Sequence, residues 1–396
     1  MSSKPLQFME QRLGMLRDQH LYRRLRTISA GSEAWIQIEG RRILNLSSNN
    51  YLGLASRPEL RAAAACAAED DGCGMGSSRL IAGSSARHNA LEARFAHFKH
   101  AESALLFNSG YTANVGVLTS LADTDDLILS DELNHASIID GCRLSRARCK
   151  VYPHGNARAL KNLIASSVQN GHKGKLIIVT DTIFSMDGDL APLQEIADLC
   201  RRYDAILVVD EAHATGCIGP AGRGLIAELD INYEATISIN TLSKALGSFG
   251  AIITGSAIVR EYLINVARNF IFTTALPPAT IAASQAAVDV LEQHPSLVER
   301  LQENAAFFRA GLRDAGFNIL ASSTHIIPIQ VGDAGVAVEM AEELLQSGIL
   351  AVAIRPPTVP ANTSRIRTSV MATHSQADLV HALAVFERIG KKMHVI

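Results

Sequence analysis

Short apolar runs alternate with helical segments through the middle of this chain, and this alternation constrains the fold more than any other feature. The runs end in polar or glycine-containing stretches and lie at 103–110, 126–131, 175–181, 205–213, 235–240 and 250–255. Segments with helical periodicity lie between many of them, for example PLQEIADLCRRYD after KLIIVTD. The pattern predicts βαβ units, and therefore an α/β fold in which helices cover both faces of a large, mainly parallel sheet.

The pattern changes near residue 277. Two long helical segments are followed there by the strand-like runs HIIPIQVGD and SRIRTSV, with a helical segment between them, which is typical of a smaller α+β domain. The first fifty residues contain a charged helix and the candidate strands AWIQIEG and RRILNLSS, too little for an independent domain. We therefore expect an N-terminal arm at 1–50, a large domain at 51–285 and a small C-terminal domain at 286–396.

The charge balance argues against polyanionic partners. The 396 residues include 37 basic and 39 acidic side chains and no long basic block, so neither nucleic acid nor an anionic membrane is an expected partner. The N-terminal segment lacks the continuous apolar core of a signal peptide. The six cysteines form no C-x-x-C pair and no H-E-x-x-H string occurs. We expect a cytoplasmic protein with reduced thiols and no metal site.

Ligands of open α/β sheets bind beyond the carboxyl ends of the strands, so the polar residues that end the apolar runs are the candidates for a site. In FNSGYTAN a strand end runs through glycine into a predicted helix, whose free amides and dipole suit a phosphate. A plain strand-to-helix turn capped by serine is the alternative for this stretch alone. The other strand ends supply Asp181, Asp210 with His213, and Thr241 with Lys244.

Lys244 stands among small residues in TLSKALG, directly after an apolar strand. It is either a surface residue at a strand end or a reactive amine, because a buried lysine is costly unless its pKa falls or it is covalently engaged. Asp210 ends a strand that we expect to be buried, so its carboxylate needs a cationic or protonated partner. The letters DEAH also occur in nucleoside triphosphatases, but those need a G-x-x-x-x-G-K-[ST] loop, which this sequence lacks.

A strand-end lysine, a strand-end aspartate and a helix start suited to phosphate together predict pyridoxal 5'-phosphate as cofactor. The lysine forms the Schiff base, the carboxylate keeps the pyridine nitrogen protonated and the helix start holds the phosphate.

The sequence resembles the α-oxoamine synthases, pyridoxal-phosphate enzymes with the aspartate-aminotransferase-like fold (fold type I). The similarity is colinear from SSNNYLGL to VMATHS, which is nearly the whole chain. It includes GSSRLIAG, LFNSGYTAN, LNHASIIDG, TDTIFSMDGDLAPL, VVDEAHATGCIGPAGRG and TLSKALGSFGA.

The resemblance implies a catalytic group around the cofactor. Lys244 would bind the cofactor and move the α proton of the substrate, and Asp210 would pair with the pyridinium nitrogen. His213 would bond the phenolic oxygen, His135 would stack on the ring, and Ser185 would support the same oxygen or its surroundings. Singly, each has a plainer interpretation, such as a helix-start histidine for His135 or a turn residue for Ser185; the colinear set favours the functional one.

The resemblance also implies binding residues. Gly110 and Tyr111 would hold the phosphate through backbone amides, helped by Thr241 and by Thr274 of the neighbouring subunit. Arg355 would hold the amino-acid carboxylate with Asn49 nearby, and Arg23 would face the acyl substrate. By itself Arg355 is better explained as a surface charge before a diproline bend.

The implied reaction is a decarboxylative condensation of an amino acid with an acyl thioester in a homodimer that shares its active site. Within the family, the segment AIRPPTVP at 353–360 resembles the members that act in biotin biosynthesis. This resemblance implies L-alanine and a pimeloyl thioester, carried by coenzyme A or acyl carrier protein, as substrates. Two alternatives stay open. One is an α-oxoamine synthase that uses glycine or serine with another acyl thioester. The other is a binding subunit with a vestigial fold, which the presence of Lys244, Asp210 and His213 disfavours.

Overall fold

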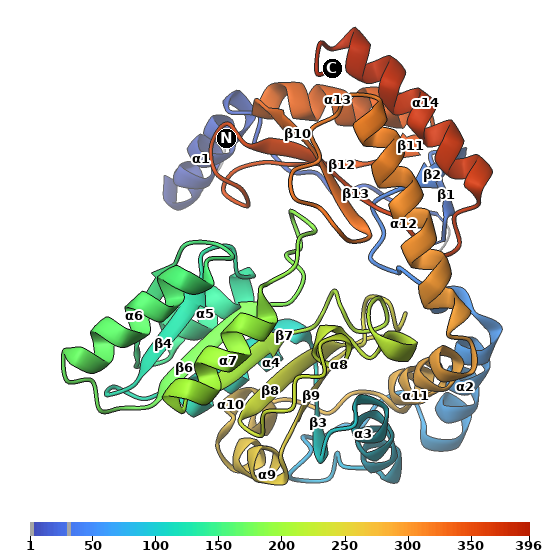
Figure 1. Cartoon of the computed structure of the whole chain (residues 1–396). Helices are drawn as coiled ribbons and strands as arrows, with labels where there is room; N and C mark the ends of the chain where they lie inside the picture. The colour runs from blue at the N-terminus through green and yellow to red at the C-terminus, as the bar shows by residue number, and fades with distance from the viewer. Residues whose placement is uncertain (1–3, 30–32) are drawn as a thin grey trace. The chain divides into compact units, whose positions relative to one another are not determined.

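The computed structural model describes residues 4–29 and 33–396. The chain forms two compact units (Figure 1). The central unit contains Leu52–Ser185 and Asp189–Glu299, and the C-terminal unit contains the residues up to Tyr51 together with Met186–Gly188 and Arg300–Ile396. The division into an N-terminal arm at 1–50, a large domain at 51–285 and a small C-terminal domain at 286–396 stays a prediction.

The central unit is built on a seven-stranded sheet with the strand order β3-β9-β8-β7-β6-β4-β5. Strands β4 to β8 pair in parallel with one another, whereas β9 pairs antiparallel with both β3 and β8. The expectation of a mainly parallel sheet is therefore confirmed. The strands are β3 (Ser103–Phe107), β4 (Leu127–Asp131), β5 (Arg148–Tyr152), β6 (Leu176–Asp181), β7 (Ile206–Asp210), β8 (Thr236–Thr241) and β9 (Ala251–Gly255).

Both faces of this sheet are buried. In β6 the consecutive residues Ile177, Ile178 and Val179 are all fully buried, although their side chains point alternately to opposite faces. Helices therefore cover both sides, as the apolar runs predicted. The helices of the unit are α2 (Pro58–Asp71), α3 (Ala86–Lys99), α4 (Gly110–Leu121), α5 (Ala136–Leu144), α6 (Ala157–Gln169), α7 (Leu193–Tyr203), α8 (Leu225–Glu228), α9 (Ala257–Val266), α10 (Arg268–Ile271) and α11 (Pro278–Gln293), with short 3-10 turns at Leu54–Ser56 and Pro220–Gly222.

Helix α7 illustrates why these segments are helical and pack on the sheet. Its buried residues Leu193, Ile196, Ala197 and Cys200 recur at the spacing of one helix face, while Arg201 and neighbouring polar side chains stay exposed. This segment, PLQEIADLCRRYD, is one that the sequence periodicity predicted to be helical.

The C-terminal unit combines two three-stranded sheets, in the orders β1-β2-β11 and β10-β13-β12. The strands expected at AWIQIEG, RRILNLSS, HIIPIQVGD and SRIRTSV are confirmed. The strands are β1 (Trp35–Ile38), β2 (Arg41–Asn45), β10 (Ile326–Gly332), β11 (Ile349–Leu350), β12 (Val352–Ile354) and β13 (Ser364–Ser369). The helices are the 3-10 turn Lys4–Leu6, α1 (Gln7–Asp18), α12 (Ser296–Asp314, whose first residues belong to the central unit), α13 (Ala334–Gln346) and α14 (Gln376–Lys392).

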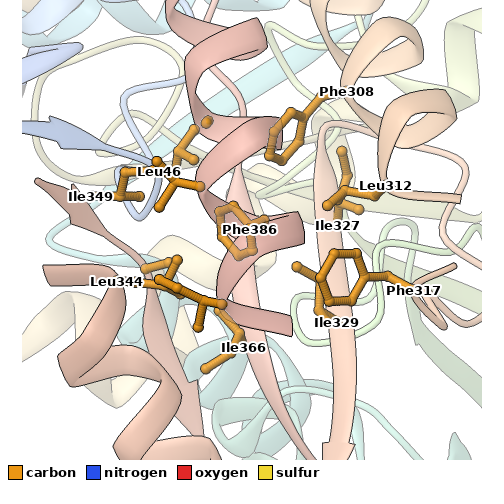
Figure 2. Close-up of a cluster of buried hydrophobic side chains, with 14 of the residues drawn as sticks. Leu46, Phe308, Leu312, Phe317, Ile327, Ile329, Leu344, Ile349, Ile366 and Phe386 are labelled. Atoms are coloured by element: carbon orange, nitrogen blue, oxygen red, sulfur yellow. The ribbon is translucent and has the colours of Figure 1, made fainter. Parts of the chain in front are cut away.

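The core of the C-terminal unit is centred on Phe386 (Figure 2). Its ring meets Phe308 and Phe317 edge-on, with ring centroids 6.1 and 6.4 Å apart. Such pairs stabilise a core by about 0.5–1.5 kcal/mol beyond their burial.

None of the helices in residues 4–29 and 33–396 is long and apolar enough to cross a membrane. All six cysteines are free thiols, and Cys142, Cys200 and Cys217 are buried.

Candidate active site

The parallel strands of the central unit end at one edge of the sheet, and their last residues are polar. Asp181 ends β6 directly beside Asp210, which ends β7, and Thr241 ends β8. Because parallel strands present their carboxyl ends at the same edge, the sequence candidates meet there.

Asp210 is buried and firmly oriented. One carboxylate oxygen accepts a hydrogen bond from the backbone N–H of Ala212 (2.8 Å), and the other accepts one from the side-chain amide of Asn114 (2.6 Å). Asn114 lies on α4 and also donates to Ser137 Oγ (2.9 Å). Both of these hydrogen-bond donors to Asp210, the Ala212 N–H and the Asn114 amide, are uncharged. A buried carboxylate, by contrast, is best stabilised by a positively charged partner. The arrangement suits a ligand that presents a protonated ring nitrogen.

Asp181 lies next to this carboxylate and is fully buried. It accepts a hydrogen bond from the backbone N–H of His135 (2.7 Å). Burial, reinforced by the negative charge of Asp210, raises the pKa of Asp181 well above its usual range. Asp181 therefore holds the segment around His135. The sequence marked Asp181 as a strand end but gave it no role.

Lys244 and His213 form a close pair, with Nζ of the lysine 2.7 Å from Nε2 of the histidine. An ammonium group can only donate, so Nε2 of His213 is the acceptor in this contact. The lysine follows β8 in a tight turn in which the backbone N–H of Gly247 bonds the Lys244 carbonyl (2.9 Å). Gly247 has φ +62°, and a Cβ there would lie 2.3 Å from the backbone nitrogen of Ala55. Only glycine fits at position 247, so this turn fixes the position of the Lys244 backbone.

His135 caps the start of α5 with its ring. Its Nδ1 accepts a hydrogen bond from the backbone N–H of Ser137 (3.2 Å) and lies 2.7 Å from the Ser137 hydroxyl. Burial lowers the pKa of His135; Asp210 opposes this effect, whereas Lys244 adds to it. The lowered pKa favours the neutral ring. Because an imidazole ring is also flat, it suits stacking on an aromatic ligand.

The start of α4 offers an anion site. Ser109 caps the helix by accepting a hydrogen bond from the backbone N–H of Thr112 (3.2 Å). The amides of Gly110 and Tyr111 have no partner within the helix, because the first turn lacks carbonyl acceptors. A Cβ on Gly110 would meet nothing within 4 Å, so a ligand can approach this backbone closely. Asn108 donates to the Thr274 carbonyl (2.9 Å).

The remaining cofactor candidates surround this edge of the sheet. The buried hydroxyl of Thr241 lies 2.7 Å from that of Ser243. The Tyr111 hydroxyl donates to Asp140, and its ring is 47% exposed. Ser185 lies half-buried in the loop after β6, where Ile183 and Leu190 form an isolated bridge.

The three substrate candidates lie in the C-terminal unit. Arg355 follows β12 and donates to the backbone carbonyl of His20. Burial lowers the pKa of Arg355, and the charge of Arg23 lowers it further. Neither arginine forms an ion pair with a carboxylate of the described residues, so the two create a region that attracts anions. Asn49 accepts hydrogen bonds from the Tyr51 hydroxyl (3.0 Å) and from Arg367 (3.3 Å).

A cavity of about 500 Å³ lies elsewhere in the central unit. It is lined by residues at the start of β8 and the end of β9, including Thr236, Ser238 and Thr254. It is therefore at the opposite edge of the sheet from Asp210 and Lys244, and we place the candidate active site by its chemistry instead.

The aminotransferase class I and II family model matches residues 41–386. The chain belongs to this family. Among curated relatives in the family, the 8-amino-7-oxononanoate synthase of Geobacter sulfurreducens is 48% identical over 97% of this chain and 98% of its own length. The 8-amino-7-oxononanoate synthase of Citrifermentans bemidjiense is 46% identical over 99% of this chain and 100% of its own length.

Solved structures agree with the family assignment. A serine palmitoyltransferase from S. paucimobilis with bound pyridoxal phosphate matches with a TM-score of 0.93 and 27% identity over 99% of both chains. The 8-amino-7-oxononanoate synthase from Francisella tularensis matches with a TM-score of 0.75 and 30% identity, covering 89% of this chain and 99% of that one. The fold type I architecture and the resemblance to the α-oxoamine synthases are confirmed.

Sequence reasoning missed two polar contacts that the structure brings to these sites. Asn114 lies four residues after Gly110, so helical spacing places both on one face of α4, a signal that was available. Arg367 is buried beside Asn49 and Tyr51, and nothing in SRIRTSV singled it out.

Proposed function

We propose that this protein is an 8-amino-7-oxononanoate synthase that joins L-alanine to a pimeloyl thioester with loss of carbon dioxide and release of the thiol. The observation that carries the chemistry is the pair formed by Lys244 and His213 next to the buried, oriented Asp210. The full-length similarity to 8-amino-7-oxononanoate synthases, at 45–48% identity, supports the choice of substrates.

The residues fit pyridoxal 5'-phosphate. Among the described residues, the hydrogen-bond donors to the buried Asp210 are uncharged, and the start of α4 leaves amides and open space for a phosphate. When bound, this cofactor supplies an aldehyde that condenses with amines and a protonated ring that accepts electrons. Asp210 would pair with the ring nitrogen, and the amides of Gly110 and Tyr111 would hold the phosphate, with Thr241 beside them.

The groups that move protons are Lys244 and its neighbours. In our proposal the lysine side chain takes the α proton of alanine and later returns a proton, while His213 holds its amine in position. The neutral ring of His135 would cover one face of the cofactor, and Ser185 would support the phenolic oxygen together with His213. Asn114 keeps Asp210 oriented through its hydrogen bond to one carboxylate oxygen.

Substrate recognition would come from the C-terminal unit. Arg355 suits a carboxylate because a guanidinium forms two parallel hydrogen bonds to it. We assign it to the carboxylate of L-alanine, with Asn49 nearby, and we assign Arg23 to the acyl substrate. The half-buried position of Arg355 strengthens its attraction for an anion.

We further propose a homodimer in which the Thr274 hydroxyl contributes to the phosphate site of the neighbouring subunit. Sedimentation of the active protein tests this, and a fully active monomer would contradict it. Coenzyme A and acyl carrier protein both remain candidate carriers, and the cytoplasmic location stays a prediction.

The deciding experiment is mass spectrometry of products. The cofactor-loaded protein is incubated with L-alanine, glycine or L-serine, each with pimeloyl and other acyl thioesters on both carriers. We expect 8-amino-7-oxononanoate from alanine and pimeloyl thioester only. Preferential product from another pair would assign a different α-oxoamine synthase. Lys244→Ala serves as the control, and full turnover in that variant would refute the assigned chemistry.

A further inference from the structure

His154 lies between two carboxylates at the strand edge of the central unit. Its Nδ1 is 2.9 Å from Asp131 and its Nε2 is 2.8 Å from Asp189. Carboxylates without a proton only accept, so both ring nitrogens donate and the side chain is an imidazolium. The ring also meets Phe184 edge-on, with centroids 4.3 Å apart. His154 is thus held from three sides.

The two carboxylates belong to segments that lead to the candidate site. Asp131 ends β4 and also accepts hydrogen bonds from the backbone N–H groups of Leu133 and Gly155 (both 2.9 Å), so it is well held without His154. Asp189 lies in the loop after β6. Its second carboxylate oxygen is buried without a partner in the described residues, and His154 is its recorded side-chain donor. The contact with His154 therefore matters more to Asp189 than to Asp131.

The loop that contains Asp189 passes from one unit to the other. Ser185 and Asp189 belong to the central unit, whereas the intervening Met186–Gly188 belongs to the C-terminal unit. There the Gly188 carbonyl accepts hydrogen bonds from the backbone N–H groups of Ser323 (3.1 Å) and Thr324 (3.2 Å) and from the Thr324 hydroxyl (2.8 Å).

The tip of this loop is fixed within the C-terminal unit by more than these bonds. Asp187 forms an ion pair with Arg365. Gly188 has φ +69°, and a Cβ there would lie 1.9 Å from the Ile326 carbonyl oxygen, so no other residue fits. The tip of the loop is therefore held within the C-terminal unit, and the chain returns to the central unit at Ser185 on one side and at Asp189 on the other.

We propose that His154 is a positioning residue that anchors Asp189, and through it the loop that carries Ser185, so that Ser185 keeps its place in the central unit. Two charge-assisted hydrogen bonds on one rigid ring suit this task, because they fix the loop to the ends of β4 and β5. The effect on turnover rests on the proposed cofactor role of Ser185, whereas the anchoring of the loop does not.

Two substitutions of His154 separate its two contacts. The amide nitrogen of glutamine lies near the position of Nε2 and that of asparagine near Nδ1. His154→Gln therefore keeps the bond to Asp189, and His154→Asn keeps only the bond to Asp131. His172→Gln is a matched control, since the exposed ring of His172 lies 3.4 Å from the Lys175 carbonyl and forms no ion pair with the described residues.

The measurements are hydrogen exchange of the amides at 182–190 in the full chain, with and without cofactor, and steady-state kinetics per cofactor-loaded site. For His154→Asn we expect loop exchange to rise at least tenfold and kcat to fall about tenfold, with KM for L-alanine within twofold of the parent. His154→Gln and His172→Gln should stay close to the parent in both measurements. A purely structural role would lower the fraction of folded protein without changing kcat per loaded site.

The proposal is overturned if His154→Asn leaves loop exchange unchanged, or raises it equally in β6 and β7. It is also overturned if His154→Gln is as impaired as His154→Asn, or if the loop loosens without a change in kcat. Absence of condensation product in the parent protein would instead refute the proposed function, while the exchange data would still test the anchoring of the loop.

Discussion

Replacing Lys99 by methionine should destabilise the central unit in a manner that depends strongly on pH. Lys99 ends α3 with its side chain 4% exposed, and its Nζ lies 2.6 Å from Glu211, whose side chain is 0% exposed. The ammonium also donates to Thr215 (3.2 Å) and to the Arg223 carbonyl. Burial lowers the pKa of Lys99, and Glu211 opposes this effect. Among the described residues, Lys99 is the one cationic side chain that forms an ion pair with Glu211.

The magnitude follows from what Lys99→Met leaves behind. Glu211 would keep only the backbone N–H of Ile226 (3.1 Å) and the hydroxyl of Ser238 (3.3 Å) as donors. Breaking a buried ion pair by removing one partner costs about 3–5 kcal/mol. The carboxyl group can avoid part of this cost by taking up a proton, which costs about 1.4 kcal/mol for each pH unit above its pKa.

The sign of the pH dependence follows. A buried carboxylate that has lost its cation is disfavoured relative to its protonated form, so the stability lost on substitution grows as pH rises. The loss should therefore be largest at pH 8 and smallest at pH 5. The double variant Lys99→Met/Glu211→Gln removes both charges, keeps an acceptor for Ile226, and should recover about 2 kcal/mol of the loss at pH 8.

Guanidinium unfolding at pH 5 to 8, followed by circular dichroism, measures these differences for the parent, both single variants and the double variant. A loss below about 1 kcal/mol for Lys99→Met at pH 8 would refute the reasoning, because buried pairs lose more than this when broken. An equal loss at pH 5 and pH 8 would also refute it, since Glu211 would then carry no uncompensated charge.

Three other perturbations test the site. Asn114→Leu removes the 2.6 Å hydrogen bond to Asp210. Because hydrogen bonds to charged groups contribute about 1.5–3 kcal/mol, equilibrium dialysis should show the dissociation constant of pyridoxal phosphate raised roughly 10- to 100-fold. An unchanged dissociation constant would contradict the role of Asn114. Arg355→Ala should raise KM for L-alanine by a similar factor and leave KM for the thioester nearly unchanged; equal effects on both would argue against a carboxylate contact. Burial lowers the pKa of His154, but hydrogen bonds to two carboxylates outweigh this effect and raise the pKa to about 10. Because the pKa of His154 is higher in the folded state than in the unfolded state, its contribution to stability is complete below pH 6.5. This contribution is lost as pH rises through about 10. Urea unfolding should show the stability difference between the parent and His154→Asn shrinking over this range, and a constant difference would count against the ion pairs.

The sheet and the strand-end residues were predictable because their signals are local. Fully apolar runs such as LIIVTD specify a strand buried on both faces, and the carboxyl ends of parallel strands must meet at one edge. Asp210 and Lys244 were therefore expected together before any contact was known. The separation of the chain into units was less predictable, because residues 186–188 join the C-terminal unit from within a loop of the central one.

The sequence by itself determined the α/β fold, the family resemblance and the chemical types at the strand ends, since these depend on apolar periodicity and on motifs read along the chain. Only the tertiary structure decided which neutral groups surround Asp210, that Asp181 shares its environment, and that His154 joins two carboxylates far apart in sequence. The physical reason is that hydrogen bonds and pKa shifts depend on distances of a few ångströms between side chains. Packing sets those distances, and no spacing along the chain encodes them.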